Sequence, residues 1–391
     1  MDKYNNGETM GDIDAALADA STLYPGAVVA RFSGKSPSRI AVAGHVDMER
    51  SAALAPDAIF RISSMTKPIT AVALMMLIER LDIELTEPVA KWLPELGKPK
   101  VLVDLHGDLD RTVPAKREIT IEDILTSRLG TGIVPAAPGS TPIQREIARQ
   151  QLVGFDAPRP ASAMGPDEWL RRLGALPLLA HPGDQWFYSV ASNVQGVLIA
   201  RLSGMALSEF LSAQVFEPLD MKDTGFYVQP GQLPRLTPAY SSDLRLADGP
   251  REGSAWAQPP AFEGGEGGLV STAADYLAFV RMLHAEGETP KGRLLGKTWI
   301  RRMLTDQLTA GQRAGAAGFL DGRGWGYGVS VDAGRSLTDG LQGTAGWSGG
   351  LGTSWLSDLS RDRAVVVMCA RALDAPAVYA DHQALQQAAL R

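Results

Sequence analysis

A serine and a lysine stand three residues apart at the start of a long apolar stretch. Ser64 and Lys67 frame the sequence Ser-Met-Thr-Lys. A serine hydroxyl is a weak nucleophile until a base removes its proton, and a lysine amine does this when its surroundings favour the neutral form. Residues three apart on a helix share one face, so the amine reaches the hydroxyl. The pair predicts Ser64 as a nucleophile with Lys67 as its base, although this spacing also arises by chance.

A tyrosine supplies a second group for proton transfer. Tyr188 ends the loop 181–189, just before the apolar stretch 197–200. A phenol in this place relays a proton between nucleophile and leaving group when a cation lies beside it. For this segment alone, a core tyrosine packed beneath a helix is the alternative interpretation.

A glycine-rich segment, 346–354, adds a place for substrate. Glycines let a substrate lie against an edge strand, with backbone N–H groups pointing at it, and a plain hairpin is the alternative. Gly346-x-Ser348-x-Gly350 also matches the nucleophile elbow of α/β-hydrolases. That elbow needs a strand, a sharp turn at the serine and then a helix. Strand-like residues follow Ser348 instead, which argues against Ser348 as nucleophile.

The elements that must position these residues alternate along the chain. Thr272 and Asp275 predict a capping box ahead of the amphipathic stretch 276–283. Strands near both termini and helices between them indicate an α+β fold. We expect residues 1–62 and 308–391 to form a sheet domain, residues 63–307 to form a mainly helical domain, and the active site to lie in the cleft between them. The expected strands are 27–32, 40–44, 325–331, 350–356 and 363–370, and the longest expected helices are 64–81 and 376–391.

Composition excludes several classes of protein. The 391 residues are 45% apolar and 21% charged, with a net charge of −6, which argues against binding to nucleic acid or to an anionic membrane surface. No apolar run reaches the length of a membrane span. Residues 1–8 lack a signal-peptide pattern, so we expect a cytoplasmic protein. The single cysteine, Cys369, is expected to be buried, and the scattered histidines predict no metal site.

Together these segments resemble a known family. Ser64-x-x-Lys67, Tyr188-Ser189 and the Trp-Ser-Gly segment 347–349 resemble the three signature elements of class C β-lactamases and of the β-lactamase-like carboxylesterases, the family VIII esterases. Segments 216–226 and 264–276 also resemble family segments, and the likeness runs from about residue 20 to 372. It implies a β-lactamase/transpeptidase-like fold, in which an antiparallel sheet from the N- and C-terminal segments carries a mainly helical inserted region.

The resemblance also implies roles for individual residues. Ser64 attacks the carbonyl, while Lys67 and Tyr188 share the proton transfers. The backbone N–H groups of Ser64 and Gly350 form the oxyanion hole. An acyl-enzyme on Ser64 follows, which water releases without a metal or another cofactor. The substrate-binding residues are Val190, Trp347, Ser348 and Gly349.

Departures from the family pattern bear on the substrate. Trp347 replaces a lysine that helps to hold the carboxylate of β-lactam drugs, and Val190 replaces an asparagine whose amide hydrogen-bonds the substrate. Both changes favour an ester with no required negative charge. Asn193 stands where the esterases carry aspartate, and we expect it to make a structural hydrogen bond. Segment 127–130, Ser-Arg-Leu-Gly, departs from the usual His-Thr-Ser-Gly.

These observations predict a carboxylesterase that hydrolyses small carboxylic esters through a serine acyl-enzyme, with acyl transfer to alcohols as a side activity. A β-lactamase or a D-amino-acid peptidase or amidase with the same Ser-Lys-Tyr site is the first alternative. A non-catalytic penicillin-binding-like sensor is the second, and the intact site argues against it. The expected partner is a small ester; the sequence sets no oligomeric state.

Overall fold

The central sheet is built from both ends of the chain. A computed structural model describes residues 13, 17, 23–152, 164–249 and 253–391. The sheet has seven strands in the order β11-β12-β13-β14-β15-β1-β2, and every neighbouring pair is antiparallel. The predicted α+β fold, with an antiparallel sheet from both termini, is confirmed. The strands are β1 (Gly26–Ser33), β2 (Arg39–Gly44), β11 (Gly324–Trp325), β12 (Ser330–Val331), β13 (Thr344–Gly349), β14 (Thr353–Asp358) and β15 (Arg363–Cys369).

Both faces of this sheet are covered, which explains why β1 and β15 are continuously apolar. Val28 and Val366 belong to the large core shared with the helices of the molecule, including α9 (Ala273–His284). Val29 and Val365 face the opposite way and pack with α13 (Pro376–Leu390). Alternate residues of each strand thus serve two separate cores.

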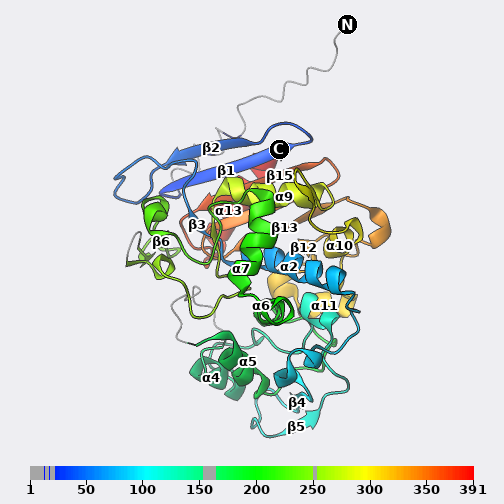
Figure 1. The fold of residues 1–391 in the computed structure, drawn as a ribbon. Helices are drawn as coiled ribbons and strands as arrows, with labels where there is room; N and C mark the ends of the chain where they lie inside the picture. The colour runs from blue at the N-terminus through cyan, green and yellow to red at the C-terminus, as the bar shows by residue number, and fades with distance from the viewer. Residues whose placement is uncertain (1–12, 14–16, 18–22, 153–163, 250–252) are drawn as a thin grey trace.

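The remaining helices and short strands lie outside the seven-stranded sheet. Figure 1 shows α4, α5 and the β4–β5 hairpin at the end away from β1 and β2. The other helices are α2 (Thr66–Leu81), α3 (Ile121–Leu125), α4 (Pro142–Arg149), α5 (Pro166–Gly174), α6 (Val190–Ser203), α7 (Leu207–Leu211), α8 (Glu217–Leu219), α10 (Lys297–Met303), α11 (Ala310–Gly315) and α12 (Ala317–Leu320). The short paired strands are β3 (Phe60–Arg61) with β8 (Val270–Ser271), β4 (Lys100–Leu102) with β5 (Thr112–Pro114), β6 (Ala239–Tyr240) with β7 (Leu246–Asp248), and β9 (Glu288–Thr289) with β10 (Gly292–Arg293).

Helix α2 runs through the centre of the core. Every residue from Thr66 to Ile78 is buried, and the helix packs against α6. A helix that is apolar on all sides is stable only when it is surrounded by protein. It ends where Asp82 adopts a left-handed conformation, with φ of 51°. The expected helix 64–81 is confirmed, except that its first turn, Ser63–Met65, is a 3₁₀ turn.

Three local predictions need correction. The expected strand 325–331 is a hairpin, because the turn between β11 and β12 is closed by a bond from Gly326 N to Val329 O. The expected strand 350–356 begins only at Thr353, because the glycines before it form a turn. The capping box at α9 is half formed: the Thr272 hydroxyl accepts from Asp275 N, but the Asp275 carboxylate accepts from Asp223 N and Thr224.

The two-domain division stays a prediction. Helix α9 comes from the segment assigned to the helical domain, yet it packs against β15 and β1. Residues 1–8, which carry the cytoplasmic expectation, lie outside the described residues. In the described part of the chain, no single helix has the length and apolar composition of a membrane span, although α6 and the helical segment Leu207–Leu219, which meet at an angle of 80°, have them when taken together.

Helix α13 makes stability depend on pH through His382. This side chain is 1% exposed, and its Nε2 lies 2.8 Å from Ser354 Oγ on β14. Burial lowers the pKa of His382 from 6.5 to about 4. Between these two pH values the unfolded chain binds more protons than the folded chain. The contribution of His382 to the free energy of unfolding is therefore fully present above pH 6.5 and is lost as the pH falls toward 4. Burial also lowers the pKa of His284, which acts in the same direction.

We predict that His382→Gln, which keeps a polar group near Ser354, weakens this dependence. Urea unfolding of the unchanged protein at pH 7 and pH 4 should differ by up to about 3 kcal/mol from His382 alone. The variant should show a correspondingly smaller difference. Equal pH dependence of the two proteins would contradict the assignment.

Candidate active site

The turn that carries Ser64 is held from three directions. Ile62 N donates to Leu269 O at 3.0 Å, just before β8. The Tyr276 hydroxyl of α9 donates to Met65 O at 3.0 Å, and the Thr353 hydroxyl of β14 donates to Ile62 O at 3.2 Å. These bonds fix the backbone on both sides of the half-buried Ser64.

Strand β13 lies against this turn because Gly349 has no side chain. A Cβ at Gly349 would lie 2.2 Å from Ile62 O and 2.4 Å from Thr353 Oγ1. No other residue fits there without moving the strand away from Ser64. Gly350 directly follows β13, so its N–H is close in sequence to this contact. Its pairing with the Ser64 N–H as an oxyanion hole stays a prediction.

Lys67 is buried against Ser64. Its side chain lies in the second position of α2 and the residue is 2% exposed. The amine Nζ donates to Ser64 Oγ at 2.9 Å and to Glu266 O at 2.7 Å. It also lies 4.4 Å from the centre of the Tyr188 ring. The structure thus brings together the three residues that the sequence singled out.

The Tyr188 hydroxyl is hydrogen-bonded to a side chain of β13. It accepts a hydrogen bond from Trp347 Nε1 at 2.8 Å. The Lys67 amine contacts the face of the Tyr188 ring. The indole N–H of Trp347 therefore occupies a lone pair of the phenol and leaves its proton free to be donated.

The loop before α6 places Tyr188 through its backbone. Tyr188 O accepts from Ile133 N at 3.0 Å, and a Cβ on Gly132 would lie 2.5 Å from the same oxygen. Phe187 N donates to Ser127 O at 2.9 Å. The segment 127–133, whose first four residues depart from the family pattern, thus supports the loop that carries Tyr188.

Strand register separates the residues of the Trp-Ser-Gly segment. Trp347 pairs with Trp355, and Gly349 pairs with Thr353. These residues face α9 and the Ser64 turn, since Trp355 packs on Tyr276 and Thr353 bonds to Ile62. Ser348 pairs with Ser354, whose hydroxyl contacts His382 of α13 on the other face. This register argues against Ser348 as a substrate contact, and its place within β13 removes the strand–turn–helix context of a nucleophile elbow.

Of the two predictions for residues of α6, one is wrong and one is confirmed. Val190, expected to contact substrate, is 0% exposed and belongs to the main core. That expectation is wrong because the side chain has no surface open to a ligand. Asn193 was expected to make a structural hydrogen bond, and its Oδ1 accepts from Glu266 N at 3.1 Å. That expectation is confirmed.

Glu266 is the site residue that sequence reasoning missed. Its backbone contacts both Lys67 and Asn193, and its carboxylate accepts from the Ser189 hydroxyl. The glycine-rich segment 264–268 was noted only for its family resemblance. Glycines on both sides of one acidic residue were the available signal, because they indicate close backbone packing around it.

Aromatic rings surround Tyr188. The Phe319 ring of α12 lies 4.9 Å from the Tyr188 ring, and that of Trp347 lies 5.6 Å away, between ring centres. Trp186 and Trp325 complete the cluster behind them. Phe319 is 40% exposed, so this aromatic wall continues from the buried cluster to the solvent.

A second serine–histidine–aspartate arrangement lies away from this site. His284 Nδ1 lies 2.9 Å from Asp362 Oδ1, and His284 Nε2 lies 2.8 Å from Ser357 Oγ. Ser357 is fully buried and its oxygen also accepts from Trp355 Nε1 at 2.8 Å. The group joins α9 to the β14–β15 hairpin. Because no substrate reaches Ser357, the arrangement is structural.

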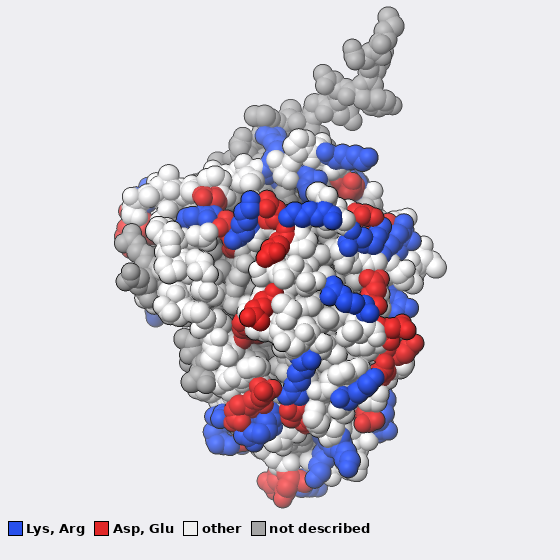
Figure 2. Space-filling view, in the orientation of Figure 1, with Lys and Arg blue, Asp and Glu red and all other residues white. Residues whose placement is uncertain are grey.

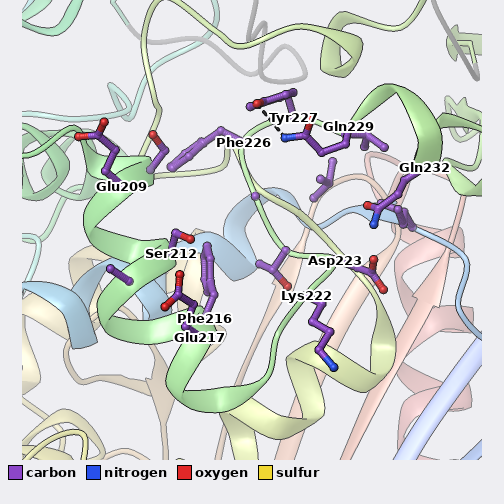
Figure 3. A pocket seen from close by; sticks show the side chains of 17 residues that line it. Glu209, Ser212, Phe216, Glu217, Lys222, Asp223, Phe226, Tyr227, Gln229 and Gln232 are labelled. Carbon is purple, nitrogen blue, oxygen red and sulfur yellow. Dashed lines mark hydrogen bonds between the residues drawn. The ribbon is translucent and has the colours of Figure 1, made fainter.

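A separate cavity lies on another part of the described surface. A cavity of about 480 Å³ lies between α7–α8 and the loop 222–232, lined by Glu209, Phe216, Lys222 and Gln229 among others, and Ser64, Lys67 and Tyr188 do not line it (Figure 3). In the described residues, no three His, Cys, Asp or Glu side chains are placed to hold a metal. Basic and acidic side chains are interspersed on the face that Figure 2 shows. Cys369 is fully buried, as expected, and burial raises the pKa of its thiol.

Comparison with known proteins identifies the family of this chain. A family model described as Beta-lactamase matches residues 13–390. Protein Rv1367c of Mycobacterium tuberculosis is 38% identical over 351 residues, which cover 87% of this chain and 84% of that protein. Esterase EstB of Burkholderia gladioli is 30% identical over 378 residues, 91% of this chain and 88% of EstB.

A solved structure shares the fold. EstCE1, described as a hydrolase with promiscuous acyltransferase activity, superimposes with a TM-score of 0.76 at 23% identity, over 97% of this chain and 98% of that one. The β-lactamase/transpeptidase-like fold that the motifs implied is therefore confirmed. The match of the family model over nearly the whole chain shows that the protein belongs to the beta-lactamase family.

Proposed function

We propose that this protein is a serine carboxylesterase that hydrolyses small uncharged esters through an acyl-enzyme on Ser64. The observation that carries the proposal is the 2.9 Å contact between the buried Lys67 amine and Ser64 Oγ. A relative that is 30% identical, EstB, is named an esterase. Residence in the cytoplasm is part of the proposal.

Acylation begins when the roles in that contact are exchanged, so that Ser64 Oγ is the donor and the Lys67 amine is the acceptor. The neutral Lys67 amine takes the proton of Ser64 Oγ as the oxygen attacks the ester carbonyl. The carbonyl oxygen gains negative charge, which the backbone N–H groups of Ser64 and Gly350 stabilise. Collapse of this intermediate breaks the bond to the alcohol oxygen and leaves the acyl group on Ser64.

Tyr188 supplies the proton for the departing alkoxide. Its hydroxyl accepts from Trp347 Nε1, and this bond stabilises the phenolate that forms when the proton leaves. The ammonium of Lys67 faces the same ring and stabilises this phenolate further. The ammonium then gives a proton to the phenolate, which restores the neutral amine and the Tyr188 hydroxyl. A water molecule then attacks the acyl group and restores Ser64. An alcohol in place of water gives acyl transfer.

The walls of the site favour uncharged substrates. Trp347 occupies the position from which a cation would bind a carboxylate, and an indole offers one N–H donor and apolar surface. Phe319 and Tyr188 extend that surface. β-Lactams, and peptides with a free C-terminus, carry a carboxylate. Trp347, Phe319 and Tyr188 offer no cation to bind it, so the lactamase and peptidase alternatives are less favoured.

We predict fast hydrolysis of p-nitrophenyl butyrate and slow or absent hydrolysis of nitrocefin. Mass spectrometry after brief exposure to the ester should find the butyryl group on the peptide that contains Ser64. Ser64→Ala should abolish turnover, whereas Ser348→Ala should retain most of it. Faster turnover of nitrocefin would support the lactamase alternative, and an adduct on Ser348 would overturn the assignment of the nucleophile.

Replacement of Lys67 tests its role as the base. Lys67→Ala should lower kcat for the ester by at least about 100-fold, the low end for loss of an acid–base group. Lys91→Ala is the matched control, because Lys91 is exposed and pairs with Glu87 on the surface. Steady-state rates close to the unchanged enzyme for Lys67→Ala would contradict the mechanism.

Phe319 tests the apolar wall. Phe319→Ala should lower kcat/KM by roughly 10-fold for a phenylacetyl ester, with little effect on the acetyl ester of the same alcohol, since a lost aromatic contact removes about 1 kcal/mol or more. Tyr379→Ala, which removes an exposed ring on α13, is the control. If both esters lose equally, the ring does not contribute to selectivity.

A further inference from the structure

Glu266 lies between the two residues that move protons. It belongs to the glycine-rich segment before β8, and its backbone is bonded on both sides. Its carbonyl oxygen accepts from Lys67 Nζ at 2.7 Å, and its N–H donates to Asn193 Oδ1 at 3.1 Å. The backbone of Glu266 thereby connects Lys67 of α2 with Asn193 of α6.

The segment around Glu266 cannot shift easily. The Thr70 hydroxyl of α2 donates to Gly265 O at 2.8 Å. A Cβ on Gly265 would lie 2.4 Å from Ser192 O, so α6 touches the backbone directly. Backbone contact of this kind leaves no room for rearrangement. The Glu266 side chain therefore projects from a fixed point.

The Glu266 carboxylate holds the residue that follows Tyr188. It accepts from the Ser189 hydroxyl. Ser189 has φ of 88° and ψ of −69°, a γ-turn conformation that is rare and strained for a residue with a side chain. A strained residue persists only when its surroundings hold it. Hydrogen bonds to a carboxylate are about twice as strong as neutral ones, so this contact is suited to hold the turn.

We propose that Glu266 is a positioning residue that couples Lys67 to Tyr188. Its carbonyl fixes the Lys67 amine, while its carboxylate, through Ser189, fixes the turn that aims Tyr188. The inference rests on the proposed function, because it assumes that these two side chains share the proton transfers. The coupling sets the distance between the amine and the phenol ring, which is 4.4 Å from Nζ to the ring centre.

The test uses labelling of Ser64 by a fluorophosphonate, which needs no knowledge of the natural substrate. The saturating rate, kinact, reports activation of the serine, and KI reports binding. We expect Glu266→Ala and Ser189→Ala each to lower kinact roughly 10-fold with KI little changed, as misplaced catalytic groups do. Glu266→Gln keeps an acceptor for Ser189 and should recover most of the rate.

The double variant carries the strongest information. If the two side chains act through one contact, Glu266→Ala with Ser189→Ala should be no slower than either single variant. Glu263→Ala is the matched control: Glu263 lies in the same segment and its carboxylate accepts from Ser208 N at 2.8 Å, a contact with α7 away from Lys67 and Tyr188. It should keep the unchanged labelling rate. Circular dichroism and the Tm of each variant establish that it is folded; should Glu266→Ala not fold, Ser189→Ala and Glu266→Gln decide.

Several outcomes would overturn the coupling. These are unchanged labelling of the Ser189→Ala variant, losses that multiply to roughly 100-fold in the double variant, and an equal loss in the Glu263→Ala control. Failure of the unchanged protein to be labelled at Ser64 would overturn the proposed function together with this inference. A labelled protein that is insensitive to Ser189→Ala would overturn this inference alone.

Discussion

The amine of Lys67 needs hydrogen-bond partners because it is buried, and the arrangement of the site follows from that need. A buried polar group without partners is costly, so the chain must bring acceptors to it. One acceptor is Ser64 Oγ, a turn earlier in the same segment. The other is Glu266 O, from a segment about two hundred residues later. The face of Tyr188 covers the remaining side. Each contact belongs to a different region of the chain, so the lysine gathers the site around itself.

Local chemistry was predictable from the sequence where neighbours in the chain determine it. The spacing of Ser64 and Lys67 fixes their contact on one helix, and the apolar character of β1 and β15 follows from burial on both faces. The family motifs supplied the order of elements. The structural hydrogen bond of Asn193 was expected from its position in the esterase motif, and Glu266 N donates it.

Contacts between distant segments were not predictable. Nothing near Glu266 in the sequence shows that its carbonyl meets Lys67, because the meeting depends on how α2, α6 and the loop before β8 pack. Val190 was misplaced for a similar reason: its position in the motif is known, but the rotation of α6 turns its side chain into the core. The hairpin 324–331 was missed because glycines also occur within continuous strands, so the glycines of this strand-like run did not by themselves indicate a turn.

The turn that carries Ser64 depends on residues spread over most of the chain. Leu269, Tyr276 and Thr353 bond to its backbone, and Gly349 lies against it. During synthesis, residues 62–67 leave the ribosome long before these partners exist. The turn around Ser64 therefore gains its contacts with Gly349 and Thr353 only after the C-terminal strands have been made. A truncated chain that ends before β14 would lack the Thr353 hydroxyl bond to this turn.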